Sequence, residues 1–318
     1  MIAPGTKGHV LVTGAGGFIG SDLTARLAKA GWRVRAATRS PSNLAPSERV
    51  DIVGLGDLTR PFDWAPLVDG ITHIIHLAGI AHATDTIPAQ SYQAVNADAV
   101  GALASAAVRA GCQRVILMSS IRAQTGPSAT ATIDESTPAN PTDAYGRAKL
   151  DGERQLFATL RPDQTQGVVL RPVVVYGRGV KGNMAALQRI AASPMPLPIG
   201  RLSARRSLLG LTNLHSAVEH ALTSPNAVGR TFVLADPHPL TLPQMVAIMR
   251  DALDRKPRLL NIPPDAMRWL ITTLGRQSAW QRIAGDLVVS TAALESSGWQ
   301  PSETAEAGIS RWMTTIAR

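Results

Sequence analysis

The chain has 318 residues, of which 45% are hydrophobic and 17% are charged, and this composition excludes a disordered, collagen-like or coiled-coil protein. A chain of this length can bury a hydrophobic core large enough to be stable without disulfides or a metal. Its single cysteine, Cys112, excludes a disulfide framework and a thiolate zinc site. The formal net charge of +9 favours an anionic partner, but the basic residues are scattered, so we predict a phosphorylated small molecule and no nucleic acid.

The sequence has no apolar run long enough to span a bilayer, and its N-terminal segment lacks the pattern of a signal peptide. We therefore expect a cytoplasmic protein without membrane insertion. Cys112 lies in an apolar stretch, which predicts a buried and unreactive thiol. His73 and His76 lie in an apolar run and are predicted to be structural, and no spacing of His, Asp and Glu indicates a metal site.

Short β-branched runs alternate with Ala-rich helical stretches over the first 175 residues. The predicted strands are residues 9–13, 34–37, 51–54, 73–77, 114–119 and 168–175. The predicted helices are residues 18–30, 64–68, 97–110 and 144–160. Strands joined by crossover helices indicate an α/β protein with a Rossmann-type, doubly wound parallel sheet.

The regular alternation of predicted strands and helices ends after Tyr176, and the segments that follow contain many of the prolines and tryptophans. We expect a dinucleotide-binding domain over residues 1–177 and a smaller substrate-binding cap formed by residues 178–204 and 237–318. Residues 205–236 are expected to return to the first domain, so the boundary is interleaved.

A glycine-rich turn follows the first predicted strand, in the stretch VTGAGGFIG at residues 12–20. Glycines between a strand and a helix let backbone N–H groups approach a pyrophosphate, and the helix N-terminus adds partial positive charge. This context predicts a dinucleotide site that includes Gly14, Gly17, Phe18, Ile19 and Gly20.

A residue that contacts the 2′ position of the adenosine ribose is expected at the end of the second predicted strand. This strand end carries Thr38 and Arg39 and no carboxylate. An acidic side chain would repel a 2′-phosphate, whereas an arginine can pair with one. We therefore predict that NADP(H) is favoured, with NAD(H) as the alternative.

A proton-transfer pair is indicated by Tyr145 and Lys149, which are four residues apart on a predicted helix and so share a face. A lysine ammonium favours the phenolate of a neighbouring tyrosine, which predicts a lowered pKa for Tyr145. Ser119 and Ser120 end the fifth predicted strand, at the edge where doubly wound folds bind ligands. Ser120 is expected to orient a reacting oxygen beside Tyr145.

With these three features in order, the whole chain resembles the extended short-chain dehydrogenase/reductase family of nucleotide-sugar epimerases, dehydratases and ketoreductases. The matching stretches are TGAGGFIG at 13–20, GDL at 56–58, HLAG at 76–79, VN at 95–96, MSS at 118–120, YGRAK at 145–149 and LRPVVVYG at 170–177.

The resemblance implies roles for further residues. Asp57 and Leu58 would flank the adenine, and Ala78 and Gly79 would line the ribose–phosphate stretch. The implied cofactor set is completed by Leu77, Asn96, Tyr145, Lys149 and Pro172. The implied substrate set consists of Ser120, Arg122, Asn183, Arg206 and Arg282, with the last two arginines pairing with a diphosphate.

One departure from the family pattern is informative. Family dehydratases carry an Asp-Glu pair where this chain has Ile121 and Arg122, so dehydration is not expected. The stretches VYGRGVKGN at 175–183 and RRSLLGLTNL at 205–214 resemble the subgroup that acts on UDP-N-acetyl sugars for surface polysaccharides.

The sequence therefore predicts a nucleotide-sugar oxidoreductase acting at sugar C4, either a 4-keto reductase or a 4-epimerase, with UDP-sugars favoured. Thr38 and Arg39 favour the reductase, because they suit an exchangeable NADPH. Two alternatives stay open, namely a reductase of a lipid, steroid or flavonoid carbonyl and a non-catalytic dinucleotide sensor. The sugar, the nucleobase and a homodimeric state are left open as well.

Overall fold

The structure, a computed structural model, describes residues 7–40, 44–81, 86–161, 163–273, 280 and 283–317. The strands are β1 His9–Thr13, β2 Arg33–Thr38, β3 Val50–Gly54, β4 His73–His76, β5 Arg114–Met118, β6 Gln166–Pro172, β7 Val174–Tyr176, β8 Arg205–Arg206, β9 Leu208–Gly210, β10 Thr231–Leu234 and β11 Leu240–Thr241. The α-helices are α1 Gly20–Lys29, α2 Ala65–Val68, α3 Ala89–Gln93, α4 Ala99–Arg109, α5 Ala144–Thr159, α6 Gly182–Ala192, α7 Leu211–Thr223, α8 Leu242–Asp251, α9 Pro264–Thr273, α11 Ala292–Ser296 and α12 Ala305–Ala317.

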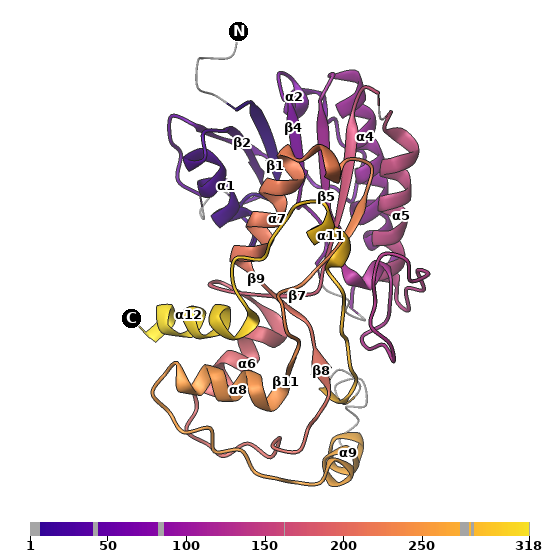
Figure 1. The fold of residues 1–318 in the computed structure, drawn as a ribbon. Coiled ribbons are helices and arrows are strands. Elements are labelled where there is room, and N and C mark those ends of the chain that lie inside the picture. Colours follow the sequence, from indigo (N-terminus) through magenta and orange to yellow (C-terminus); the bar gives the residue numbers. More distant parts are fainter. Residues whose placement is uncertain are drawn as a thin grey trace. The chain divides into compact units, whose positions relative to one another are not determined.

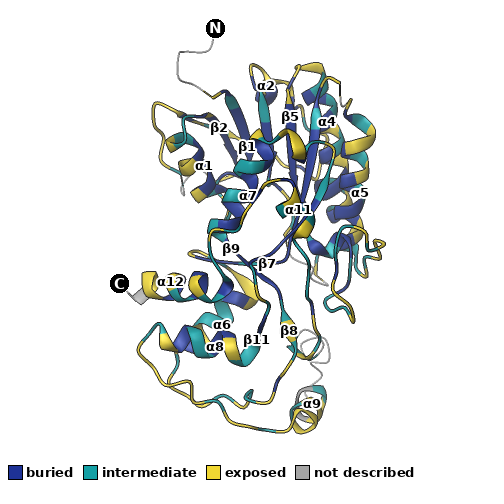
Figure 2. Cartoon of the chain, in the orientation of Figure 1, coloured by how far each residue is buried: buried dark blue, intermediate teal, exposed yellow. Residues whose placement is uncertain are grey.

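A seven-stranded sheet in the order β10-β6-β5-β4-β1-β2-β3 forms the centre of the fold (Figure 1). The pairs of β1 with β2 and β4, of β2 with β3, and of β5 with β4 and β6 are all parallel. The inner strands are built of β-branched and aliphatic residues and are dark with burial in Figure 2. The predicted Rossmann-type fold is confirmed.

The last predicted strand of this series, residues 168–175, is wrong in its extent. The chain forms β6 up to Pro172 and then β7, which pairs with β9 in a separate two-stranded sheet. A proline has no N–H to continue a ladder, so the central sheet loses this strand at Pro172. β8 also lies outside the central sheet, because it pairs with β11, whereas β10 joins the sheet beside β6.

The chain divides into two compact units. Unit 1 consists of residues 1–125, 138–171 and 217–232, and unit 2 consists of residues 126–137, 172–216 and 233–318. Unit 1 has a core of aliphatic side chains from the strands, α4 and α5, among them Leu11, Ile74, Leu117 and Leu156. Cys112 belongs to this core, and burial raises the pKa of its thiol to about 11, in agreement with an unreactive cysteine.

Unit 2 has a core of its own, in which α8 packs against both α6 and α12 (Figure 1). Its apolar side chains include Met184, Met249, Ile309 and Trp312. Among the described residues, no helix is long and apolar enough to cross a membrane.

Candidate active site

The carboxyl ends of β1, β2, β4 and β5 gather at one edge of the central sheet, because these strands are neighbours and run parallel. Each of them is followed by predicted site residues. In unit 1 this edge therefore unites the glycine-rich turn, the segment after β2, the segment after β4 and the serines after β5.

The glycine-rich turn after β1 is too tight for side chains. Gly14 has a φ of +70°, and a Cβ there would lie 2.8 Å from the backbone nitrogen of Ala78. A Cβ on Gly20 would overlap the carbonyl oxygen of Gly14. Gly16, which sequence reasoning left out, would bring a Cβ within 2.5 Å of Thr38 Oγ1. The turn thus forms a bare backbone cradle in front of α1, and Phe18 and Ile19 lead into that helix.

The segment after β2 is held by Thr38, which is buried and whose Oγ1 accepts from the N–H of Ser40 at 3.2 Å. Arg39 is exposed next to it. Asp57 accepts from the backbone N–H and the hydroxyl of Thr59, and these bonds lower the pKa of its carboxyl, to which Arg60 and Arg39 also contribute. An arginine and a carboxylate with a lowered pKa thus lie at the end of the cradle where an adenosine is expected.

The segment after β4 is fixed by Asn96, which lies in a π-helical turn, residues Ala94–Asp98, ahead of α4. Its side chain accepts from the N–H of Ile80 at 3.0 Å and donates to the carbonyl of the same residue at 3.1 Å. A Cβ on Gly79 would lie 2.7 Å from Asn96 Oδ1 and 3.2 Å from Lys149 Nζ. Asn96 therefore holds Ala78 and Gly79 beside the lysine. Leu77, which is half-buried, begins this segment directly after β4, and Leu58 is buried in the unit 1 core.

His76, at the end of β4, is structural as predicted. Its Nδ1 lies 2.9 Å from Thr13 Oγ1, and burial followed by the charge of Lys149 lowers the pKa of its imidazole to about 3. The ring is neutral at physiological pH. His73 is also kept neutral, because burial lowers its pKa to about 4.

Ser120 and Tyr145 meet at the end of β5. Ser120 is the N-cap of a short 3₁₀ turn, Ile121–Ala123, where its Oγ accepts from the backbone N–H of Arg122 at 3.2 Å. The Ser120 side chain also forms a hydrogen bond with the Tyr145 hydroxyl. Tyr145 is 7% exposed and its ring meets that of Tyr92 edge-on at 6.0 Å.

The pKa of Tyr145 differs from the sequence-based expectation. Burial raises it, and the Ser120 hydrogen bond only partly opposes this effect. The negative charge of Asp143 raises it further. The Lys149 Nζ donates to the carbonyl of Met118 at 3.1 Å. Tyr145 is therefore a neutral phenol at physiological pH.

Two glycines bring α5 close to the other parts of the site, and sequence reasoning missed both. A Cβ on Gly146 would overlap the carbonyl oxygen of Arg122, and one on Gly152 would overlap that of Asn96. Asp143 caps the helix by accepting from the N–H of Gly146 at 2.7 Å. Both glycines are visible in the stretch DAYGRAKLDGE at 143–153. Small residues on a helix indicate that another segment packs closely against it, but they do not indicate which segment.

The remaining predicted residues have the following surroundings. Arg122 forms an ion pair with Asp143 at 2.5 Å. Pro172 ends β6. In unit 2, Asn183 is exposed in the first turn of α6, and Arg206 donates to the carbonyls of Gly285 and Pro127 at 2.9 and 3.0 Å. Arg282 lies outside the described residues, and the substrate roles of these side chains stay predictions.

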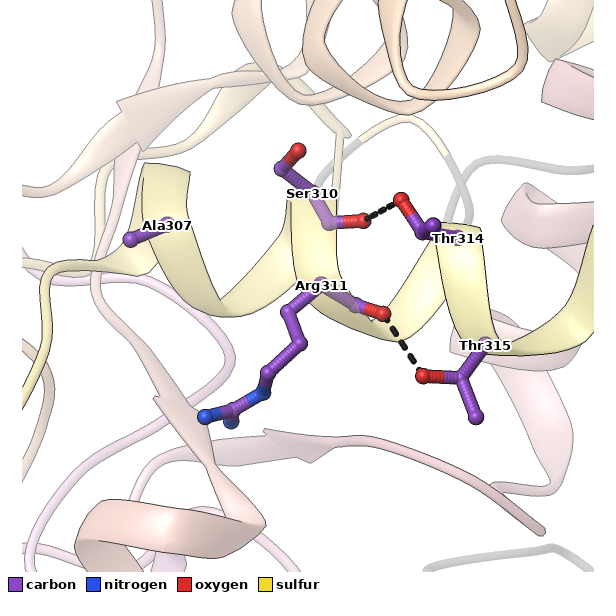
Figure 3. A pocket seen from close by; sticks show the side chains of 5 residues that line it. All are labelled: Ala307, Ser310, Arg311, Thr314 and Thr315. Carbon is purple, nitrogen blue, oxygen red and sulfur yellow. Dashed lines mark hydrogen bonds between the residues drawn. The ribbon is translucent and has the colours of Figure 1, made fainter.

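Unit 2 also has a surface hollow on one face of α12, which none of the predicted site residues lines (Figure 3). The hydroxyl of Thr314 donates to the carbonyl of Ser310, and that of Thr315 donates to the carbonyl of Arg311, both at 2.9 Å. Arg311 itself donates to Glu303 and Thr212. Most of the polar side chains that line the hollow are thus hydrogen-bonded within the protein.

Within the described parts of the chain, no group of three His, Cys, Asp or Glu side chains could hold a metal ion. The bare cradle of Gly14, Gly16 and Gly20 fits the pyrophosphate of a dinucleotide, since added side chains would fill it. The buried pair of Tyr145 and Lys149 at the same sheet edge fits a hydride-transferring cofactor better than a nucleotide alone.

The comparison with known proteins agrees with this geometry. Residues 10–235 match the model of the NAD dependent epimerase/dehydratase family. The chain is 30% identical to a UDP-glucose 4-epimerase of Vibrio cholerae over 308 residues, which are 94% of this chain and 93% of that protein. It is also 30% identical to a 3 beta-hydroxysteroid dehydrogenase/Delta 5-->4-isomerase of Mycobacterium tuberculosis over 289 residues, 87% of this chain and 76% of that protein.

Among solved structures, MoeE5 in complex with UDP-glucuronic acid and NAD has the same fold, with a TM-score of 0.76 and 23% identity over 97% of this chain and 100% of that chain. The matched family model covers both the glycine-rich turn and the Tyr145–Lys149 pair. The chain therefore belongs to the NAD dependent epimerase/dehydratase family, a group of extended short-chain dehydrogenases/reductases.

Proposed function

We propose that this protein is an NADP(H)-dependent oxidoreductase that acts at C4 of a UDP-sugar, as a 4-keto reductase or a 4-epimerase. The observation that carries the proposal is the hydrogen-bonded pair of Ser120 and Tyr145 beside Lys149, at the sheet edge that bears the glycine cradle. The full-length similarity to a UDP-glucose 4-epimerase supports the sugar substrate. A sensor would not need this proton-transfer pair.

Each of the three residues has one task. The Ser120 hydroxyl orients the oxygen on the reacting carbon, and Tyr145 gives that oxygen its proton or takes it away. Lys149 holds the nicotinamide ribose and places a positive charge beside the site. The bound dinucleotide supplies or accepts the hydride.

The neutral state of Tyr145 supports the reductive direction. A phenol whose pKa is raised by burial is protonated at physiological pH and can protonate the oxygen of a carbonyl as it is reduced. Oxidation of an alcohol needs the phenolate, which is scarce at that pH. The direction of the pKa shift therefore favours a reductase over an enzyme that must start by oxidation.

A pH profile checks this argument. We expect the reductive rate to stay level between pH 5 and 7, about three units or more below a pKa that lies above the usual value near 10. This range also lies below the pKa of about 8 of Lys149, so the lysine keeps its charge. Over the same range the oxidative rate should rise about tenfold per pH unit, because it follows the phenolate fraction. Initial rates in both directions measure the effect, and an oxidative rate that is independent of pH would contradict it.

A panel of substrates tests the function. Purified protein is incubated with UDP-, GDP- and dTDP-linked sugars and their 4-keto forms, with NADPH or NADH. A reductase consumes the reduced dinucleotide in step with the product, whereas a 4-epimerase interconverts two sugars without net change in absorbance at about 340 nm. No turnover of any nucleotide sugar would refute the sugar assignment.

A second candidate is a hydroxysteroid or related lipid alcohol, because the chain is also 30% identical to a 3 beta-hydroxysteroid dehydrogenase/Delta 5-->4-isomerase. The anchored guanidinium of Arg206 distinguishes the two, since an apolar substrate has no diphosphate for it to bind. A 3 beta-hydroxysteroid is therefore included in the panel.

Arg39→Ala tests the cofactor preference. If the Arg39 guanidinium pairs with the 2′-phosphate, its loss should weaken NADPH binding by about 1.5–3 kcal/mol and leave NADH binding nearly unchanged. Titration calorimetry with both dinucleotides measures this. Arg109→Ala, which removes another exposed arginine of unit 1, is the control and should change neither affinity. Equal weakening of both dinucleotides by Arg39→Ala would remove the residue from the phosphate site.

A further inference from the structure

A second, buried polar cluster is adjacent to the proposed catalytic residues and has no part in the function described so far. It consists of Ser119, Gln124, Glu153 and Arg171, which are at most 8% exposed. Arg171 donates to Glu153 through Nη2 at 2.5 Å and through Nε at 3.0 Å, and its Nη1 donates to Gln124 at 3.0 Å. A buried ion pair of this kind is weak evidence for a role in stability, since apolar side chains of similar volume often replace it without loss.

The cluster reaches the catalytic segment through Ser119. The Ser119 hydroxyl donates to Glu153 Oε1 in a short hydrogen bond. Ser119 stands between Met118, whose carbonyl accepts from Lys149 Nζ at 3.1 Å, and Ser120, which bonds Tyr145. One carboxylate therefore fixes the chain segment that presents a partner to both Lys149 and Tyr145.

Glu153 also lies on the same face of α5 as Lys149, one helical turn further on. The charged and titratable groups around Lys149 are Tyr145 and Glu153 on its own helix, His76 on β4, and Arg171 on β6, which pairs with Glu153. His76 and Tyr145 are neutral. The carboxylate of Glu153 thus forms an ion pair with Arg171, and its negative charge also favours the charged form of Lys149.

We propose that Glu153, clamped by Arg171, is a positioning residue of this site: it fixes the Met118–Ser120 segment through Ser119 and stabilises the positive charge of Lys149. The inference deepens the proposed function and rests on it for the role of Lys149. Burial lowers the pKa of Lys149 to about 8, and Glu153 opposes this shift. Without the carboxylate, the lysine loses its charge nearer to neutral pH.

The test uses the full-length protein and does not depend on the substrate. The chain has only five lysines, Lys7, Lys29, Lys149, Lys181 and Lys256, so the ¹³Cε signals of labelled lysine can be assigned with Lys149→Met. In the wild type the Lys149 signal should titrate near pH 8. In Glu153→Gln it should titrate about one unit lower or more, because Arg171 is left without its counter-charge.

The kinetic arm uses the reaction found in the panel. Glu153→Gln should lower kcat about tenfold or more at neutral pH, and part of the loss should be recovered at lower pH, where Lys149 is protonated again. A purely structural role for Glu153 would not give recovery on acidification. Glu48→Gln, which neutralises an exposed carboxylate of unit 1, is the matched control and should change neither the titration nor kcat.

If Glu153→Gln does not fold, Glu153→Gln/Arg171→Met removes both charges and replaces the ion pair by neutral side chains. In the double variant the titration of Lys149 should still lie below that of the wild type. A folded variant of either kind in which Lys149 titrates as in the wild type would overturn the inference. A lowered Lys149 titration in a protein that turns over no nucleotide sugar would uphold it and refute the proposed function alone.

Discussion

Tyr145→Phe is expected to lower kcat by about 10²–10⁴-fold, the usual contribution of a positioned acid–base group. The substitution deletes one hydroxyl and keeps the ring, which packs with Tyr92 and Ala148 in a small buried cluster. Lys149 still donates to the Met118 carbonyl, so the dinucleotide affinity should stay near that of the wild type. Steady-state kinetics and dinucleotide titration together separate the loss of proton transfer from a loss of binding.

Tyr92→Phe is the control for this prediction. It removes a phenolic hydroxyl from the same cluster, 6.0 Å away between ring centroids, without touching Ser120. It should retain most of kcat. If Tyr145→Phe kept near-full turnover on a confirmed sugar nucleotide, the assignment of proton exchange to Tyr145 would be wrong and another residue would have to donate the proton.

The parts of the site that could be predicted from the sequence are those that depend on short-range patterns. Glycines between a strand and a helix, serines at the end of a strand and the spacing of Tyr145 and Lys149 are local features, and the fold they predicted is confirmed. The parallel order of the sheet follows from alternating strands and helices. These inferences needed no knowledge of which side chains meet.

The parts that could not be predicted depend on contacts between distant segments. Glu153 is bound by Ser119, directly after β5, and by Arg171 on β6, and nothing in the local pattern distinguishes it from an exposed helical glutamate. The raised pKa of Tyr145 results first from burial, which depends on segments that are distant in the sequence. The end of β6 at Pro172 is a similar case, since a proline is compatible with a continued edge strand until its pairing partner is known.

Gly20→Ala is expected to abolish or strongly weaken dinucleotide binding and to destabilise the protein. The new methyl group would overlap the Gly14 carbonyl oxygen and lie 2.8 Å from Ala15 Cα. Both are backbone atoms of the cradle, and the Gly14 oxygen already accepts from the N–H of Gly17 at 2.9 Å. The turn must therefore move, at a cost of about 1–3 kcal/mol or more in the free energy of unfolding, and the N–H groups that face a pyrophosphate move with it.

Two further glycine substitutions give this prediction a graded comparison. A Cβ on Gly17 would meet one atom, the Gly14 oxygen at 3.1 Å, so Gly17→Ala should have an intermediate effect. A Cβ on Gly54, at the end of β3, meets nothing within 4 Å, and Gly54→Ala should stay within about 0.5 kcal/mol of the wild type. Thermal unfolding and NADH titration measure the three variants side by side. Wild-type NADH affinity in folded Gly20→Ala would show that the pyrophosphate does not bind at this turn, because a displaced cradle could not hold it unchanged.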